Sequence, residues 1–136
     1  MNCTTLKTAV LPSNLTSVPA NMFYGCKVLE EADIPETVVS IGADAFRNCT
    51  ALSEISIPSG VTSIGNNAFY GCATPTSLVV PDSVTSLGSG AFGGCKGLVT
   101  VTLPKDISTI PSSLFLNCTA ITENIIAITP TAYTKT

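Results

Sequence analysis

The segment Leu52–Cys72, L-S-E-I-S-I-P-S-G-V-T-S-I-G-N-N-A-F-Y-G-C, decides the fold because its pattern recurs along the whole chain. Its apolar residues Ile55 and Ile57 lie two apart and Pro58 follows them, as expected of a short strand that ends where proline offers no N–H. The stretch 61–64 predicts a second short extended piece. The closing N-N-A-F-Y-G-C is too short for a full helix and predicts a single helical or 3-10 turn.

This pattern returns every 23 residues. The cysteine column of the repeat consists of Cys3, Cys26, Cys49, Cys72, Cys95 and Cys118. The phenylalanine column consists of Phe23, Phe46, Phe69, Phe92 and Phe115. Repeats of about 20 to 50 residues are typical of solenoids, in which each unit covers its apolar face only by stacking on its neighbours. We therefore predict a solenoid over residues 1–128, with about five full repeats and a partial one, and a polar tail or linker over 129–136.

Stacking in register places the phenylalanine column in the core, together with Cys26, Cys49, Cys72 and Cys95. We expect six free thiols and no disulfide, because the Cβ vectors of stacked cysteines run parallel instead of converging. Free cysteine packs well as a small apolar residue. Zinc is not expected, since the chain has no histidine and one column of cysteines cannot surround an ion tetrahedrally. We predict no metal and no cofactor.

The units C-K-V-L-E-E-A-D-I-P-E-T-V-V-S-I-G-A-D-A-F-R-N (26–48) and C-T-A-L-S-E-I-S-I-P-S-G-V-T-S-I-G-N-N-A-F-Y-G (49–71) resemble leucine-rich repeats of the BspA-like, or treponemal, class. The resemblance covers residues 3 to about 126. It implies a right-handed solenoid with a parallel β-sheet on one, concave, face, and short strands with single helical or 3-10 turns on the other. It also implies a bacterial or protozoan surface protein that adheres to host molecules or other cells, without shared catalytic residues.

Several function classes are disfavoured by composition. Catalysis needs a positioned acid, base or nucleophile, and a chain with no histidine and buried thiols offers almost none, so we predict that it is not an enzyme. Six scattered Lys and Arg and a net charge of -3 disfavour nucleic acid as a partner. No apolar run approaches the roughly 20 residues that span a bilayer. We expect no cleavable signal peptide in this sequence, because M-N-C-T-T-L-K (1–7) begins directly inside the repeat. We expect an extracellular or cell-surface location as part of a longer protein.

One candidate binding surface is the outward face of the predicted long strands. If Ile55 points inward, Glu54 and Ser56 point outward, beside Glu31 and Asp33 of the preceding repeat. Like charges on neighbouring strands repel, so this acidic cluster could bind a basic partner segment or a cation. The simpler alternative is a solvated face on an acidic protein.

A second candidate follows the phenylalanines. Tyr24, Arg47 and Tyr70 lie on three consecutive repeats and predict a ring, guanidinium, ring stack worth about 0.5 to 1 kcal/mol when exposed. Tyr and Arg are enriched in interface hot spots, although a fortuitous surface stack is the plainer alternative. Two functions remain: an interaction module that binds a protein or glycan of a host or neighbouring cell, or a structural spacer in a larger surface protein.

The repeat weakens toward the C-terminus, where Ile126 is expected to align with Leu103. Apolar residues of the outermost repeats, such as Leu6, Leu11 and Ile121, are expected to face water. The open ends of a parallel sheet are templates for pairing, so end-to-end self-association is possible.

Overall fold

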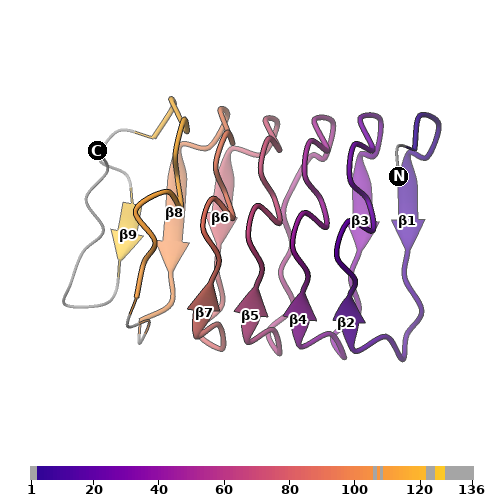
Figure 1. Ribbon diagram of the computed structural model, residues 1–136, viewed down its shortest axis with the longest axis horizontal. Coiled ribbons are helices and arrows are strands. Elements are labelled where there is room, and N and C mark those ends of the chain that lie inside the picture. Colours follow the sequence, from indigo (N-terminus) through magenta and orange to yellow (C-terminus); the bar gives the residue numbers. More distant parts are fainter. Residues whose placement is uncertain (1–2, 106, 108, 122–124, 128–136) are drawn as a thin grey trace.

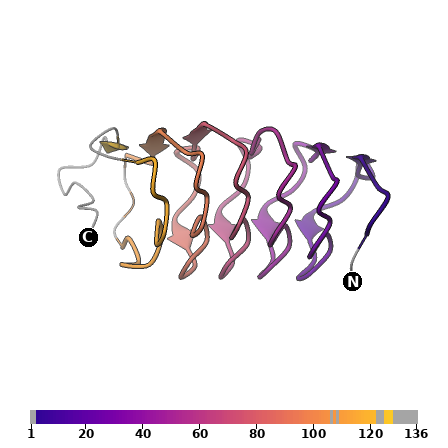
Figure 2. The same ribbon diagram turned by 90° about the horizontal axis from the view of Figure 1, so that it is seen from above.

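The chain folds into a solenoid of stacked coils in the computed structural model, which describes residues 3–105, 107, 109–121 and 125–127 (Figure 1). The strands in this part of the chain are β1 (Thr8–Val10), β2 (Ser17–Val18), β3 (Glu31–Asp33), β4 (Ser40–Ile41), β5 (Ser63–Ile64), β6 (Ser77–Val79), β7 (Ser86–Leu87), β8 (Thr100–Leu103) and β9 (Ile125–Ala127). Figure 2 shows them as two rows on different sides of the coil. Within the described residues, no helix is long and apolar enough to cross a membrane.

Strand pairing confirms that each 23-residue repeat makes one coil. All pairs are parallel, and Thr8 lies opposite Glu31 just as Ser17 lies opposite Ser40. The short strands form one continuous sheet in the order β2-β4-β5-β7, whereas the long strands form the two sheets β1-β3 and β6-β8-β9. The predicted fold class, a leucine-rich-repeat solenoid with parallel sheets, is therefore confirmed.

The sheet of long strands is interrupted at the third coil, where the sequence predicted a strand. Ile55 points inward as expected, but no backbone hydrogen bond joins residues 54–57 to β3 or β6, all of which the structure describes. On one side, Glu54 lies beside Glu31, and like charges on neighbouring strands disfavour pairing. On the other side, Pro75 occupies the position that Leu52 has in the preceding repeat. The amide of Leu52 donates to the carbonyl of Cys49, and a proline has no N–H for such a bond. The charge repulsion weakens the ladder directly, whereas the proline removes a turn bond within the coil that leads into β6.

The predicted helical turn is instead a run of consecutive hydrogen-bonded turns. The amides of Tyr24 and Cys26 donate to carbonyls three residues back in their own coil, at 3.2 and 3.0 Å. The amide of Phe23 between them donates to Ala45 of the next coil, at 2.7 Å. A helix would use every amide internally and leave none for the neighbouring coil. Here alternate amides bond within the coil and to the next coil, so both the turn and the contact between coils are hydrogen-bonded.

The residue before each cysteine adopts the left-handed conformation that its Asn or Gly predicted. Positive φ angles occur at Gly25 (73°), Asn48 (62°), Gly71 (81°), Gly94 (65°) and Asn117 (64°). Asn and Gly adopt this conformation at low cost, which is why only these two residue types occupy the column.

The aromatic core is a continuous stack, as predicted. Ring centroids of consecutive phenylalanines from Phe23 to Phe115 lie 5.2, 5.1, 5.6 and 6.1 Å apart. The rings are nearly parallel, with interplanar angles between 3° and 23°. All five phenylalanines and the predicted core cysteines Cys26, Cys49, Cys72 and Cys95 are buried.

The prediction of six free thiols is wrong at one pair, because Cys3 and Cys26 form a disulfide. Their Cα atoms are 4.6 Å apart, so stacking alone brings equal positions into bridging range. Cys3 is only half-buried, so its side chain has room to turn toward Cys26. Cys49, Cys72 and Cys95 are free thiols.

Each thiol from Cys49 onward donates a hydrogen bond to a phenylalanine carbonyl 26 residues earlier. The Sγ atoms of Cys49, Cys72, Cys95 and Cys118 lie 3.1, 3.3, 3.3 and 2.9 Å from these oxygens. The sulfur column and the ring column are thus tied together through the backbone.

Predictions for the two ends need correction. Strand β9 pairs with β8 at an offset of 24 residues, which places Ala127 rather than Ile126 opposite Leu103, because the last repeat holds one more residue between the paired strands. Leu11 and Ile121 are buried, with 7% and 0% exposure, because both pack into the hydrophobic core cluster. Leu6 is 37% exposed, as expected. The predicted tail, 129–136, lies outside the described residues.

Candidate functional site

The outward residues of the long strands are exposed, as the alternation predicted. Glu31 and Asp33 on β3 are exposed, and Glu54 and Ser56 of the third coil lie beside them. The burial pattern of the third coil keeps its period of two although the ladder is missing. Side-chain alternation is therefore set by burial of the inward residues rather than by pairing.

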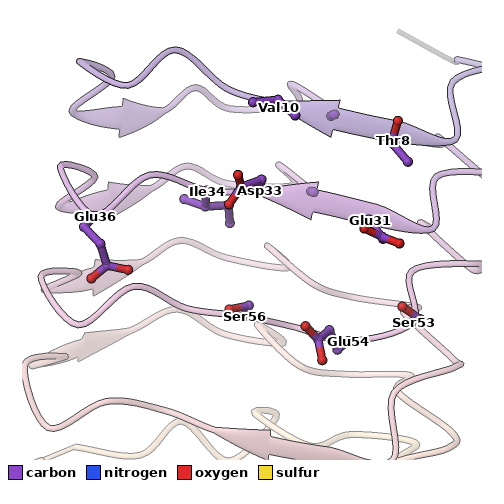
Figure 3. A pocket seen from close by; sticks show the side chains of 11 residues that line it. Thr8, Val10, Glu31, Asp33, Ile34, Glu36, Ser53, Glu54 and Ser56 are labelled. Carbon is purple, nitrogen blue, oxygen red and sulfur yellow. The ribbon is translucent and has the colours of Figure 1, made fainter.

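These residues meet in an open hollow of about 640 Å³ across the first three coils (Figure 3). Its polar lining consists of Thr8, Glu31, Asp33, Glu36, Ser53, Glu54 and Ser56. Figure 3 shows the carboxylates of Glu31 and Asp33 on one coil and that of Glu54 on the next. We call this surface the acidic hollow. It brings together all four residues of the first predicted site.

Glu36 belongs to the acidic hollow and was missed from the sequence. It follows the proline that ends the strand, so the period-two argument did not reach it. A signal was present, because the residue after this proline is polar in five repeats: Ser13, Glu36, Ser59, Asp82 and Lys105. In the structure the hydroxyl of Ser59 donates to Oε1 of Glu36 at 3.1 Å, which places that carboxylate at the rim.

The carboxylates of the acidic hollow lack cationic partners within the described part of the chain. The ion pair found there joins Arg47 to Asp44 and lies elsewhere. Glu31, Asp33, Glu36 and Glu54 therefore present uncompensated negative charge to solvent. Opposite charge on a partner would be attracted, most strongly at low ionic strength.

The acidic hollow continues toward the C-terminus into a smaller one of about 280 Å³. Glu54 and Ser56 line both, and Ser77 and Val79 extend the second. Val79 on β6 is 63% exposed, and Val10 on β1, at the opposite end of this surface, is 81% exposed. The face therefore offers carboxylates and hydroxyls flanked by apolar side chains.

A cation site, the other chemistry considered for this cluster, is not supported. In the residues that the structure describes, no three His, Cys, Asp or Glu side chains converge closely enough to hold a metal ion. The carboxylates are spread along the coils, which suits an extended partner better than a point charge.

Tyr24, Arg47 and Tyr70 form the stack that the sequence predicted, and their role as a binding site stays a prediction. The guanidinium carbon of Arg47 lies 5.9 Å from the ring centroid of Tyr24 and 5.1 Å from that of Tyr70. Nη1 of Arg47 donates to Oδ1 of Asp44 at 3.2 Å, whereas its Nε is buried without a partner in the described chain. The ion pair is partly exposed, so it orients the guanidinium more than it stabilises the fold. The stack lies on the turn segments and is separate from the acidic hollow.

The buried thiols are poorly suited to nucleophilic chemistry. Burial raises the pKa of the Cys49 thiol from its ordinary value of 9.0 to about 11. Burial also raises the pKa of Cys72, and a hydrogen bond with Cys118 together with burial raises that of Cys95. A reactive cysteine needs a lowered pKa, because the thiolate is the nucleophile.

Comparisons with known proteins agree with this geometry. A family model described as the BspA type leucine rich repeat region matches residues 1–122 in six copies. No curated protein matches the chain. Among solved structures, the Treponema pallidum leucine-rich repeat protein is 26% identical with a TM-score of 0.79, over 90% of this chain and 70% of that one.

Two longer proteins are also similar. A leucine-rich repeat protein from Bacteroides ovatus is 34% identical with a TM-score of 0.80, over 85% of this chain and 30% of that one. The pneumococcal vaccine antigen PcpA is 26% identical with a TM-score of 0.74, over 82% of this chain and 28% of that one. The chain thus spans less than a third of the length of these two proteins.

Proposed function

The chain belongs to the BspA-type leucine-rich repeat family, and from that premise we propose that it is a non-enzymatic interaction module of a bacterial cell-surface or secreted protein. Its similarity to bacterial leucine-rich repeat proteins supports this, as does the description of one of them as a vaccine antigen. In this role the chain holds a protein or glycan of a host or neighbouring cell.

The observation that carries the proposal is the acidic hollow. Four carboxylates without cationic partners in the described chain lie on a face that the core makes rigid. A rigid surface loses little conformational entropy on binding, which favours recognition over a surface that must first be ordered. The partner chemistry that fits best is an extended, lysine- or arginine-rich segment of another protein.

Such a segment suits the shape as well as the charge. The acidic hollow crosses three coils, which at the usual strand spacing amounts to about 10 Å along the solenoid axis. Cationic side chains would reach Glu31 and Glu54, while apolar side chains would contact Val10 and Val79 at the two flanks.

A charge-reversal experiment tests this proposal. Binding of a lysine-rich peptide and a glutamate-rich peptide of equal length is measured by calorimetry at low and moderate salt. We expect only the lysine-rich peptide to bind, more weakly as salt rises, and the double variant Glu31→Lys with Glu54→Lys to lose binding. Glu30→Lys is the matched control, because Glu30 is exposed and adjacent but does not line the hollow. Unchanged binding by the double variant would refute the proposal.

The alternative function is a structural spacer, in which the repeats supply length and stiffness while other domains bind. The unbroken ring stack and the continuous β2-β4-β5-β7 sheet favour a stiff rod. Beads coated with the chain distinguish the two functions. If the chain is an interaction module, coated beads attach to target cells, and attachment falls with the double variant. If it is a spacer, coated beads attach no better than bare beads.

A further inference from the structure

A separate hollow of about 470 Å³ lies where the turn segments lead toward the long strands of the third to sixth coils. At its floor two consecutive coils carry glycine, at Gly71 and Gly94, where the flanking coils carry Asn48 and Asn117. The Oδ1 atom of Asn48 lies over Gly71, so the open part of the floor is at Gly94. We call this hollow the turn-side hollow. Its volume falls in the range of about 300 to 1,000 Å³ that is usual for ligand sites.

The polar groups of the turn-side hollow are available to a ligand. Within the described chain, no hydrogen bond of the side-chain amides of Asn48 and Asn117 is found, and each can both donate and accept. The column just after the cysteines contributes the hydroxyl of Thr119 and the ammonium of Lys96. Lys96 has no ion-pair partner in the described residues. Lys96 is the sole charged residue of this lining, in contrast to the acidic hollow.

Tyr70 forms a fixed wall of this hollow. One face of its ring packs against Arg47, whose guanidinium carbon lies 5.1 Å from the ring centroid. The ring also lies close to Gly93, where an added Cβ would come within 2.7 Å of two ring carbons. Only the ring edge and hydroxyl are left to face a ligand, and they are held in place before binding, which lowers the entropic cost.

We propose that the turn-side hollow binds a short oligosaccharide that carries a carboxylate. Amides and hydroxyls match sugar hydroxyls as mutual donors and acceptors, and Lys96 pairs with the carboxylate. Asn48 and Asn117 are three coils apart, about 14 Å, so the hollow accommodates more than one sugar ring. A peptide fits less well, because none of the lining residues belongs to a strand whose edge could pair with it. Nucleic acid requires more than one cation.

The first test compares two matched sugars. Sialyllactose and lactose share a disaccharide, and only the former adds a sugar with a carboxylate. Titration followed by nuclear magnetic resonance should show sialyllactose binding about tenfold more tightly, as expected for one charge-assisted hydrogen bond. Lys96→Gln should abolish this preference. Absence of sialyllactose binding, or equal affinities for both sugars, would overturn the proposal.

The second test fills the hollow. Gly94→Asn restores the residue that occupies this column at Asn48 and Asn117, where φ is 62° and 64°, close to the 65° of Gly94. The backbone conformation therefore accepts asparagine, although its Cβ would lie 3.3 Å from Cε1 of Tyr70 and from the nitrogen of Gly71. We expect at least a tenfold loss of sialyllactose affinity, with the fold retained and the melting temperature only slightly lowered. Gly25→Asn makes the same substitution in the same column outside the hollow and should bind normally.

Further outcomes also decide the matter. Sialyllactose binding that survives both Lys96→Gln and Gly94→Asn places the ligand elsewhere and overturns the assignment. Competition by a glutamate-rich peptide with equal affinity would assign the hollow to acidic peptides instead of saccharides. The charge reversals at Glu31 and Glu54 should leave sialyllactose binding intact, so failure of this proposal is distinguishable from failure of the proposed basic-peptide site.

Discussion

An interior phenylalanine of this chain packs between the phenylalanines of the two neighbouring coils. Phe69 lies 5.1 Å from Phe46 and 5.6 Å from Phe92, and its ring is 1% exposed. The adjacent thiol of Cys95 donates to its carbonyl oxygen. The phenylalanine column thus supplies aromatic packing between coils. From Cys49 onward, the cysteine column supplies sulfur packing and a hydrogen bond to a phenylalanine carbonyl.

Truncating this ring should be costly. We expect Phe69→Ala to lower the free energy of unfolding by about 3 to 5 kcal/mol, because it leaves a cavity that two rings border. Leu116→Ala is the control, since Leu116 is 50% exposed and should cost little. Chemical denaturation measures both. A Phe69→Ala variant that is as stable as the control would contradict the stacked core.

The buried thiols should make the fold sensitive to alkali. Burial raises the pKa of Cys72 in the folded state, so between pH 9 and 10 the unfolded chain releases this proton while the folded chain retains it. Stability is therefore complete below the ordinary thiol pKa and falls as the pH rises above it, by about 1.4 kcal/mol per pH unit for each fully buried thiol.

Cys72→Ala isolates this effect. Urea unfolding at pH 8 and pH 10 should show a smaller loss of stability in the variant than in the parent chain, because one buried titrating thiol has been removed. A loss of equal size in both proteins would show that Cys72 does not titrate differently in the two states.

In the turn segments, some backbone amides bond within their own coil and others bond to the neighbouring coil. The sequence predicted the inward and outward positions of the long strands correctly, because a period of two and a closing proline leave one arrangement that buries Ile55. It could not distinguish a helical turn from paired turns. That choice depends on amides such as that of Phe23 bonding to the next coil, a demand that no single repeat reveals.

Other elements illustrate further limits of the sequence. The break in the long-strand sheet lies where Glu54 stands beside Glu31 of the preceding coil, a relation between two coils that the pattern of one repeat does not contain. The disulfide of Cys3 depends on how the two side chains turn toward each other, which the spacing of cysteines in the repeat does not show. Of the candidate site, the acidic residues of the strands were predictable, and Glu36 was visible only as a polar column after the proline.

The break in the sheet predicts uneven hydrogen exchange within one coil. Amides of residues 54–57 should exchange faster than those of β8, because no backbone hydrogen bond protects them in the described structure. Amides of β5, in the same coil but in the continuous sheet, should be protected. Equal protection of residues 54–57 and β5 would show that the long-strand ladder is intact.

Close approach of coils makes some glycines irreplaceable. A Cβ at Gly65 would lie 2.6 Å from the backbone nitrogen of Ala43, whereas one at Gly60 would lie 3.4 Å from its nearest neighbour, the carbonyl oxygen of Glu36. We expect Gly65→Ala to destabilise the chain by about 1 to 3 kcal/mol and Gly60→Ala to have a much smaller effect. Thermal unfolding of the two variants checks this, and equal melting temperatures would contradict the coil spacing.

The whole molecule is a linear array in which each coil contacts only its neighbours, so stability is close to a sum of coil and interface contributions. Its two candidate sites lie on different parts of this array and share no residue. The acidic hollow uses the long-strand face, and the turn-side hollow uses the column before the cysteines. One scaffold can therefore present two binding chemistries, a negative face and a polar hollow with one positive charge.

End-to-end self-association stays a prediction at this scale. Leu6 and Val10 are exposed on the first coil, and the free edge of β1 offers backbone groups for pairing. Light scattering over a range of concentrations should show growth of the apparent mass. A constant monomer mass would exclude association through this edge.

The central claim is that every 23-residue repeat forms one coil and that equal positions lie on neighbouring coils. Nuclear Overhauser contacts between the ring protons of Phe46 and Phe69 test it most directly, because their centroids are 5.1 Å apart although the residues are 23 positions apart in sequence. The account predicts strong contacts between these rings and between Phe69 and Phe92. Rings without mutual contacts, or rings exposed to solvent, would contradict it.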